Sequence, residues 1–240
     1  MVSNWWIIWK AYVWKEIREV LATMKATILL CIITANLLQY MTIEEVMKLN
    51  LDEKTCALQL GSIQMYLVII IVMFLGHTLI NRFIYNERKS KTIHVMLASG
   101  MGKTAIWSAK MFVTIAISEI VTWISLLVNL AFIKLYYGFT VEFNSISTIL
   151  IFVTMPLVCY GILALISIAY WYFPNMNIFG MIFPMVAYLG TWNVALQLAS
   201  KFVDEKLVIV SVGIGVITIL LSMVLIKYIP KERIASREFS

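Results

Sequence analysis

Long hydrophobic segments alternate with short polar ones along almost the whole chain. A helix needs about 20 largely apolar residues to cross a membrane, and six segments approach that length. The pattern therefore predicts an all-α integral membrane protein with six spans, over 26–41, 61–85, 105–132, 147–172, 177–194 and 207–228. The fifth of these contains Gly180, Pro184 and Gly190, which predict a kink or an early end.

Residues 5–24 are too charged to span a membrane, yet they keep a helical period. Hydrophobic residues recur at spacings of three and four on one face: Trp6, Trp9, Val13, Ile17, Val20 and Met24. The opposite face carries Lys15, Arg18, Glu19, Ala22 and Lys25. This pattern predicts an amphipathic helix in the membrane interface that leads into the first span. The alternative is a helix packed against another protein domain.

Composition agrees with a membrane location. Hydrophobic residues make up 62% of the 240 positions and charged residues only 13%, about half the charged share of a soluble domain. Such a chain cannot cover its surface with polar groups, so lipid must be its main solvent. There is no long polar linker and no repeat, which predicts a single membrane domain over 1–240.

The basic residues indicate the orientation. If the N-terminus is cytoplasmic, 14 of the 19 lysines and arginines fall on the cytoplasmic side of the six predicted spans. Cytoplasmic loops are enriched in these residues, so both termini are expected in the cytoplasm and the chain in the cell membrane. The net charge of +6 then reflects topology and contact with anionic lipid, and no nucleic-acid partner is expected.

The loop over 86–104, between the second and third spans, is the only sizeable cytoplasmic one. Ser90 or Thr92 is suited to cap a short helix, on which Ile93, Met96 and Leu97 would form one apolar face. Such a face at the end of two spans suits docking into a groove of a soluble partner. The alternative is an ordinary loop helix lying on the bilayer.

This loop and the N-terminal residues 14–19 resemble the permeases of ABC-2-type transporters. Residues that match the family pattern are Glu87, Arg88, Thr92, Leu97, Ala98, Ser99 and Lys110. The chain departs from the pattern at three positions, with Lys91 in place of glycine, His94 in place of glutamate and Gly100 in place of proline.

The resemblance implies half of an ATP-driven exporter of the type V architecture. Two six-span subunits, identical or related, would pair in the bilayer and bind two cytoplasmic ATPase subunits, which carry the ATP and Mg. The helix within 86–104 would be the coupling helix, with Glu87, Arg88, Lys91, Thr92, Ile93, Met96 and Leu97 as coupling residues. An amphipathic or hydrophobic substrate, such as an antimicrobial peptide, is the expected cargo, with drug, lipid or sodium export as alternatives.

The third span carries a polar stripe with one acid. Thr114, Ser118, Thr122, Ser125 and Asn129 recur at helical spacing around Glu119. An acid inside a span is costly and is often functional, so Glu119, Ser118, Thr122, Ser125 and Asn129 are candidates to line a substrate path, and Glu119→Gln is expected to impair transport. The alternative interpretation is that the stripe only holds helices together.

Other motifs are incomplete. Gly102, Lys103 and Thr104 end like a phosphate-binding loop, but Leu97 stands where that motif needs glycine, so ATP is expected on a partner chain. His77, near Asn81, is interpreted as a hydrogen-bonding group between helices. No catalytic residue, cofactor or metal site is assigned to this chain. A secondary transporter and a membrane-embedded enzyme stay open as other classes.

Overall fold

The computed structural model describes residues 3–49, 51–98, 102–173, 205–230 and 234. Every regular element in these ranges is helical, and five helical segments are long and apolar enough to cross a membrane. In chain order the elements are α1 (Ser3–Thr23), α2 (Lys25–Met47), α3 (Glu53–Ile80), η1 (Asn81–Asn86), α4 (Glu87–Lys89), α5 (Thr92–Ala98), α6 (Lys103–Phe132), η2 (Ile133–Tyr137), α7 (Ser145–Ile149), η3 (Leu150–Thr154), α8 (Met155–Tyr172) and α10 (Glu205–Tyr228).

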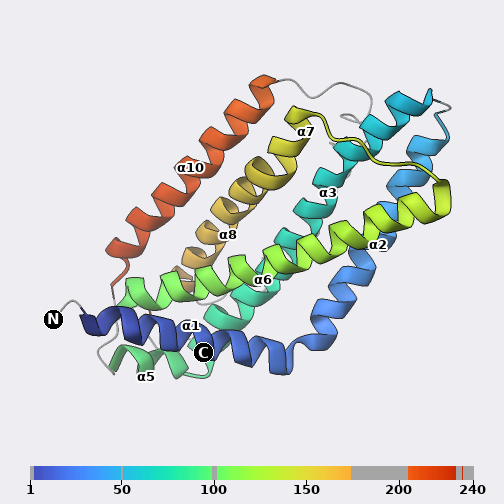
Figure 1. The fold of residues 1–240 in the computed structure, drawn as a ribbon. Helices are drawn as coiled ribbons and strands as arrows, with labels where there is room; N and C mark the ends of the chain where they lie inside the picture. Colours follow the sequence, from blue (N-terminus) through green and yellow to red (C-terminus); the bar gives the residue numbers. More distant parts are fainter. Residues whose placement is uncertain (1–2, 50, 99–101, 174–204, 231–233, 235–240) are drawn as a thin grey trace.

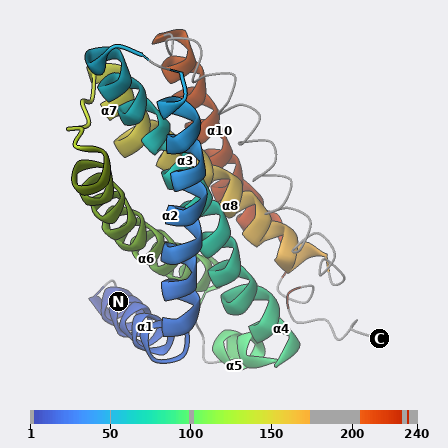
Figure 2. The ribbon, with the colours of Figure 1, turned by 90° about the vertical axis from the view of Figure 1, so that its right-hand side faces the viewer.

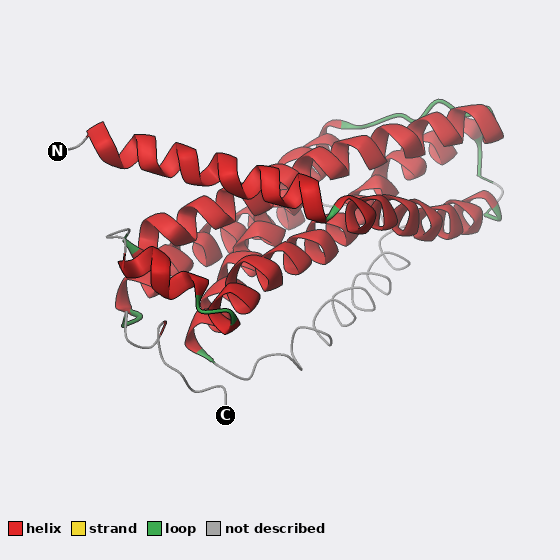
Figure 3. Cartoon of the chain, turned by 90° about the horizontal axis from the view of Figure 1, so that it is seen from below, coloured by secondary structure: helices red, strands yellow, loops and turns green. Residues whose placement is uncertain are grey.

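The long helices form a tilted bundle with two different ends (Figure 1). At one end, α1 lies across the bundle with α4 and α5 beside it, and we call this the α1 end (Figure 2). The opposite end holds the connections between α2 and α3 and between η2 and α7. The segment predicted over 5–24 forms a separate helix that packs against the bundle (Figure 3), and its place in the membrane interface stays a prediction.

Consecutive described spans α8 and α10 run side by side in the same direction (Figure 1). Arg88, at the α1 end, donates to the carbonyl oxygen of Tyr170 near the end of α8, at 3.0 Å. Lys103, at the same end, donates to the carbonyl oxygen of Lys227 near the end of α10, at 2.8 Å. The chain therefore leaves α8 at one end and enters α10 at the other. The fifth span predicted over 177–194 lies outside the described residues.

Capping side chains explain where two of the helices begin. Asp52 accepts a hydrogen bond from the amide of Thr55 at 3.1 Å, which starts α3. Asn144 accepts one from the amide of Ser147 at 2.6 Å, which starts α7. Gly138 ends η2 with a φ of +75°, a left-handed conformation that glycine adopts without strain.

The second predicted span is the centre of the bundle. In its most apolar window 78% of the residues are buried, against 28% for α2 and 17% for α10, so α2 and α10 are the peripheral helices.

Close packing joins α10 to α8 through small residues. A Cβ on Gly161 would collide with Thr218, and one on Gly215 would lie 2.9 Å from Leu157 Cγ.

The first three observed spans are longer than the hydrophobic pattern predicts, and the third, predicted over 105–132, runs from Lys103 to Tyr137. The first continues to Met47 instead of ending at 41, because Tyr40 donates to Glu44 at 2.5 Å and Lys48 pairs with Glu45 at 2.6 Å. These contacts keep an acidic turn helical. The second span starts at Glu53 instead of 61, because Asp52 caps the helix at that earlier position.

Candidate functional site

The second and third spans are joined at the α1 end by a compact pair of short helices. The second span continues from α3 through the π-helical turn η1 directly into α4. A tight turn at Ser90 and Lys91 then leads to α5, which lies against α1 (Figures 1 and 2). Helix α4 thus continues the second span without a break, and one turn separates it from α5.

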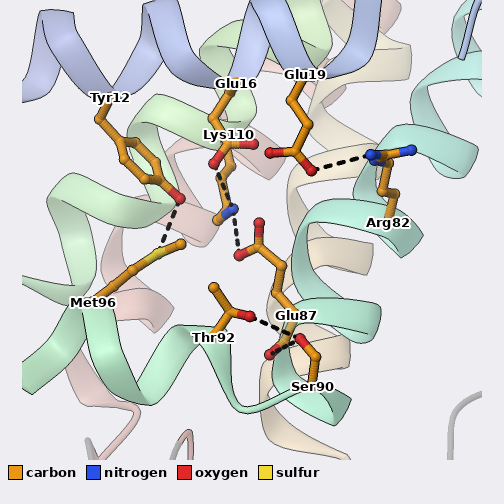
Figure 4. A network of polar contacts seen from close by, with 9 residues as sticks. All are labelled: Tyr12, Glu16, Glu19, Arg82, Glu87, Ser90, Thr92, Met96 and Lys110. Atoms are coloured by element: carbon orange, nitrogen blue, oxygen red, sulfur yellow. Dashed lines mark hydrogen bonds and ion pairs between the residues drawn. The ribbon is translucent and has the colours of Figure 1, made fainter. Parts of the chain in front are cut away.

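A buried lysine holds this junction together (Figure 4). Lys110 extends from α6 to Glu16 of α1 at 3.3 Å and to Glu87 of α4 at 2.7 Å. Its ammonium also lies over the rings of Tyr12 and Phe83, at 5.3 and 5.2 Å from their centroids. Lys110 and Glu16 are 1% and 0% exposed. One cation therefore joins three segments that are far apart in the sequence.

The charges in this cluster are unequal, since two carboxylates share one ammonium. The pKa of the Glu87 carboxyl is raised by burial and further by the charge of Glu16, while Lys110 opposes the rise. Burial, followed by the nearby acids, raises the pKa of the Tyr12 hydroxyl, so it stays protonated. The cluster thus favours a proton on Glu87 more than solvent does.

Further contacts fix α1 on the same surface. Arg82 of η1 pairs with Glu19 at 3.1 Å, and the Tyr12 hydroxyl donates to the Met96 sulfur of α5 at 3.1 Å (Figure 4). Trp9 donates through its indole nitrogen to Ser108 of α6 at 3.2 Å. Together with Lys110, these contacts connect α1 to η1, α5 and α6.

Arg88, a predicted coupling residue, is buried and turned into the bundle. Its guanidinium donates to the carbonyl oxygens of Tyr170 and Trp171 at 3.0 and 3.1 Å, where α8 ends and leaves carbonyls without helical partners. Arg88 therefore ties α4 to the fourth span.

The hydrogen bond predicted for His77 is confirmed, because its Nε2 lies 2.8 Å from the Tyr170 hydroxyl.

The apolar face of α5 is used within the chain. Ile93 is fully buried and Met96 is 8% exposed, and Leu97 packs against the same core. This corrects the expectation that these three side chains form the face presented to a partner. The exposed side of α5 and of its preceding turn carries Lys91, Val95 and Ala98 instead, with Val95 at 70% exposure.

The turn before α5 is strained at the position where the ABC-2 pattern has glycine. Lys91 has a φ of +62°, a left-handed conformation that costs about 1–2 kcal/mol for a residue with a Cβ. The hydroxyls of Ser90 and Thr92 lie 2.9 Å apart across the turn (Figure 4). Ser99, Gly100 and Met101, which complete the loop, lie outside the described residues.

The polar stripe of the third span lies inside the bundle. Ser118, Thr122, Ser125 and Asn129 are all at least 96% buried, and Ser118 faces Gly76 of α3. Glu119 points to one side of the stripe, half-buried. Its carboxylate accepts hydrogen bonds from the Tyr160 hydroxyl at 2.6 Å and the Trp123 indole at 3.1 Å. These contacts favour a role in helix packing, and the substrate-path role stays a prediction.

Residues that sequence analysis did not single out contribute much of the site. Glu16, Tyr12 and Arg82 provide partners for Lys110, Met96 and Glu19. One signal in the sequence pointed to Glu16, since it lies between Val13 and Val20 on the apolar face of α1, where a charge needs a partner. Within the described ranges, no group of three or more histidine, cysteine or acidic residues is placed to hold a metal ion.

Comparison with protein-family models, with curated proteins and with solved structures finds no match.

Proposed function

We propose that the chain is the membrane subunit of an ATP-driven exporter, and that α5 is the element on which a cytoplasmic ATPase subunit acts. The observation that carries this proposal is the connection from α5 to two spans, through contiguous helices and a buried ion pair. α5 joins α3 through α4 and η1, and Lys110 joins α4 to α6. A force applied at α5 would then move the second and third spans, α3 and α6, together.

The exposed surface of α5 supports the same role. Val95 is 70% exposed on a helix whose Ile93 and Met96 are buried, and Lys91 is exposed beside it. A single exposed aliphatic residue with a neighbouring lysine suits a shallow groove with an acidic edge on a soluble partner. In this proposal the α1 end faces the cytoplasm, as the basic residues predict.

The pairing of two subunits and the cargo follow from the resemblance to ABC-2-type permeases. Two copies of this chain, or one copy with a related one, would face each other in the cell membrane. The cargo would be an amphipathic or hydrophobic molecule, with an antimicrobial or amphipathic peptide as the leading candidate. ATP and Mg would bind to the two ATPase subunits.

Co-purification tests the proposal. The tagged chain, solubilised gently from its native membrane, should carry a cytoplasmic ATPase in stoichiometric amount. Val95→Glu should release this ATPase, because it places a charge on the proposed docking surface. Leu135→Glu is the matched control, since Leu135 is 87% exposed at the opposite end, and it should retain the ATPase. No ATPase with the wild-type chain, or retention by Val95→Glu, would reject the proposal.

Transport itself needs a second measurement. The complex reconstituted into vesicles should hydrolyse ATP faster when candidate amphipathic peptides are added. Stimulation of ATP hydrolysis by a drug or lipid but not by peptides would support the exporter function and assign it a different cargo.

A further inference from the structure

Both acidic side chains of α1 are engaged by the bundle. Glu16 is fully buried beside Lys110, at 3.3 Å, and Glu19 pairs with Arg82 of η1 at 3.1 Å. The basic residues of α1 and of the start of α2 are exposed instead: Lys10, Lys15, Arg18 and Lys25. None of these four forms an ion pair within the described residues. The exposed side of α1 is therefore strongly basic.

Two of these cations alternate with exposed tryptophans. Residues at four-residue spacing form one row along the helix, which we call the Trp–cation row: Trp6, Lys10, Trp14 and Arg18. Trp6 and Trp14 are 49% and 56% exposed. The Lys10 ammonium lies 4.7 Å from the centroid of the Trp6 ring. The Arg18 guanidinium lies 5.1 Å from the centroid of the Trp14 ring. Rings and charges thus form one continuous surface.

Most of the apolar stripe of α1 is not available to a membrane. Val13, Val20 and Met24 of this stripe are buried, because they pack into the hydrophobic core of the bundle. Periodicity predicts that the stripe enters the membrane interface, and these three residues lie against protein instead. Contact of α1 with lipid is therefore left to its exposed side, which carries the Trp–cation row.

The neighbours of α1 indicate its depth in a bilayer. The third span, Lys103–Tyr137, has 35 residues and is about 52 Å long, roughly 20 Å more than the hydrocarbon core. About seven residues at each end therefore lie among the headgroups, and the hydrocarbon begins at about residue 110. Trp9 donates to Ser108 at 3.2 Å, and its ring lies 5.4 Å from that of the exposed Phe112. The N-terminal half of α1 thus lies beside the third span, at the level where headgroups meet hydrocarbon.

Charge and residue type together identify the occupant of this surface. Tryptophan concentrates at the headgroup level of membranes, and each lysine or arginine near an anionic surface strengthens binding about fivefold. Pairing the row with that of a second copy would bring like charges together. We propose that the Trp–cation row binds the headgroups of anionic phospholipids in the leaflet at the α1 end, and that this contact holds α1 docked beside Lys110. The proposal does not depend on ATP-driven transport.

Hydrogen–deuterium exchange tests the proposal on the full chain in nanodiscs. The nanodiscs contain phosphatidylcholine alone or with a rising fraction of phosphatidylglycerol. The amides of α1 should exchange about twentyfold more slowly in the anionic nanodiscs, since each of the two cations in the row contributes about fivefold. The amides of α3 should not change. Phosphatidylserine should act like phosphatidylglycerol, and zwitterionic phosphatidylethanolamine should have no effect.

Three double variants assign the effect to the row. Lys10→Gln with Arg18→Gln should lose the slowing, and it should fold because both side chains are exposed. Lys10→Arg with Arg18→Lys keeps both charges and should keep the slowing. Lys54→Gln with Lys134→Gln is the matched control, because it removes two exposed lysines from the opposite end, and it should behave like the wild type.

Four results would overturn the proposal. Exchange of the wild-type α1 that does not respond to anionic lipid would exclude lipid binding by the row. Slowing retained without the charges of Lys10 and Arg18 would place the lipid elsewhere. Equal loss in the Lys54 and Lys134 control would indicate a general effect of net charge. Slowing that requires an added cytoplasmic fraction, whatever the lipid, would assign the row to a soluble partner.

Discussion

Lys110 on α6 and Glu87 on α4 form a buried ion pair, with Nζ and Oε2 2.7 Å apart. The pair joins the third span to the short helices that follow the second. Glu16 of α1 approaches the same ammonium at 3.3 Å, so the lysine balances two acids.

Lys110→Met should be among the most destabilising single changes at the α1 end. It leaves Glu16 and Glu87 buried near each other without a cation, and removing one partner of a buried pair costs about 3–5 kcal/mol. Thermal unfolding in detergent should show the loss. Lys25→Met is the control, since Lys25 is exposed, and it should change stability by less than about 0.5 kcal/mol. Equal melting temperatures for the two variants would contradict the role of Lys110.

Glu87 should make the free energy of unfolding depend on pH. A carboxyl whose pKa is raised in the folded state stabilises the fold while protonated, and this contribution is lost as pH rises through the folded value. Relative to Glu87→Gln, the free energy of unfolding of the wild type should therefore fall as pH rises above the ordinary value of 4.5.

Unfolding measured between pH 4 and pH 8 in one detergent would test this dependence. Glu142→Gln, at an exposed position near the opposite end, should keep the pH dependence of the wild type. A constant difference between the wild type and Glu87→Gln over the whole range would show that Glu87 titrates as an ordinary glutamate.

Lys91→Gly should stabilise the turn between α4 and α5. Glycine removes about 1–2 kcal/mol of left-handed strain and costs about 0.5–1 kcal/mol in backbone entropy, so a net gain of roughly 0.5 kcal/mol is expected. Lys91→Val should be destabilising, because its branched Cβ fits this conformation poorly. Val95→Gly, inside α5, should lose roughly 0.3 kcal/mol, the difference in helix propensity between valine and glycine. A loss of stability in Lys91→Gly would contradict the assigned strain.

Gly161→Val should separate α8 from α10. The added side chain would collide with Thr218 and approach the Gly215 carbonyl oxygen, which lies 3.1 Å from the Cβ position. Overpacking of this kind costs about 1–3 kcal/mol. Gly213→Ala is the control, since nothing lies within 4 Å of its Cβ position, and it should gain up to about 1 kcal/mol of helix propensity. Equal stability of the two variants would mean that α8 and α10 do not pack closely here.

Hydrophobic periodicity located the helices well but not all of their ends. The predicted span over 207–228 differs from α10 by two residues at its start, and the helix over 5–24 differs from α1 by two residues at its start and one at its end. The first span was underestimated because hydropathy counts Glu44 and Glu45 as loop residues. In the structure Tyr40 and Lys48 pair with them and extend the helix. Local side-chain pairs of this type leave little trace in an apolar pattern.

The site could be predicted only in part, since its contacts join distant segments. The resemblance to the ABC-2 pattern singles out Glu87, Arg88 and Lys110, of which Arg88 and Lys110 are buried at the junction and Glu87 is 16% exposed. Their partners do not follow from the sequence, because they depend on how α1 and α8 pack at this end. Periodicity identifies the apolar face of α5 correctly, but it does not show which part of the protein that face packs against. It could not show that Ile93 and Met96 pack inward.

The 94 positions that separate Glu16 from Lys110 also impose an order on biosynthesis. The ribosome synthesises α1 long before Lys110, the cation that pairs with Glu16, because the chain is made and folds from its N-terminus. During that interval Glu16 must stay hydrated, which holds this face of α1 away from the hydrocarbon core. Docking of α1 therefore waits for the third span, and a nascent chain that stops before residue 110 leaves α1 without its buried counter-charge.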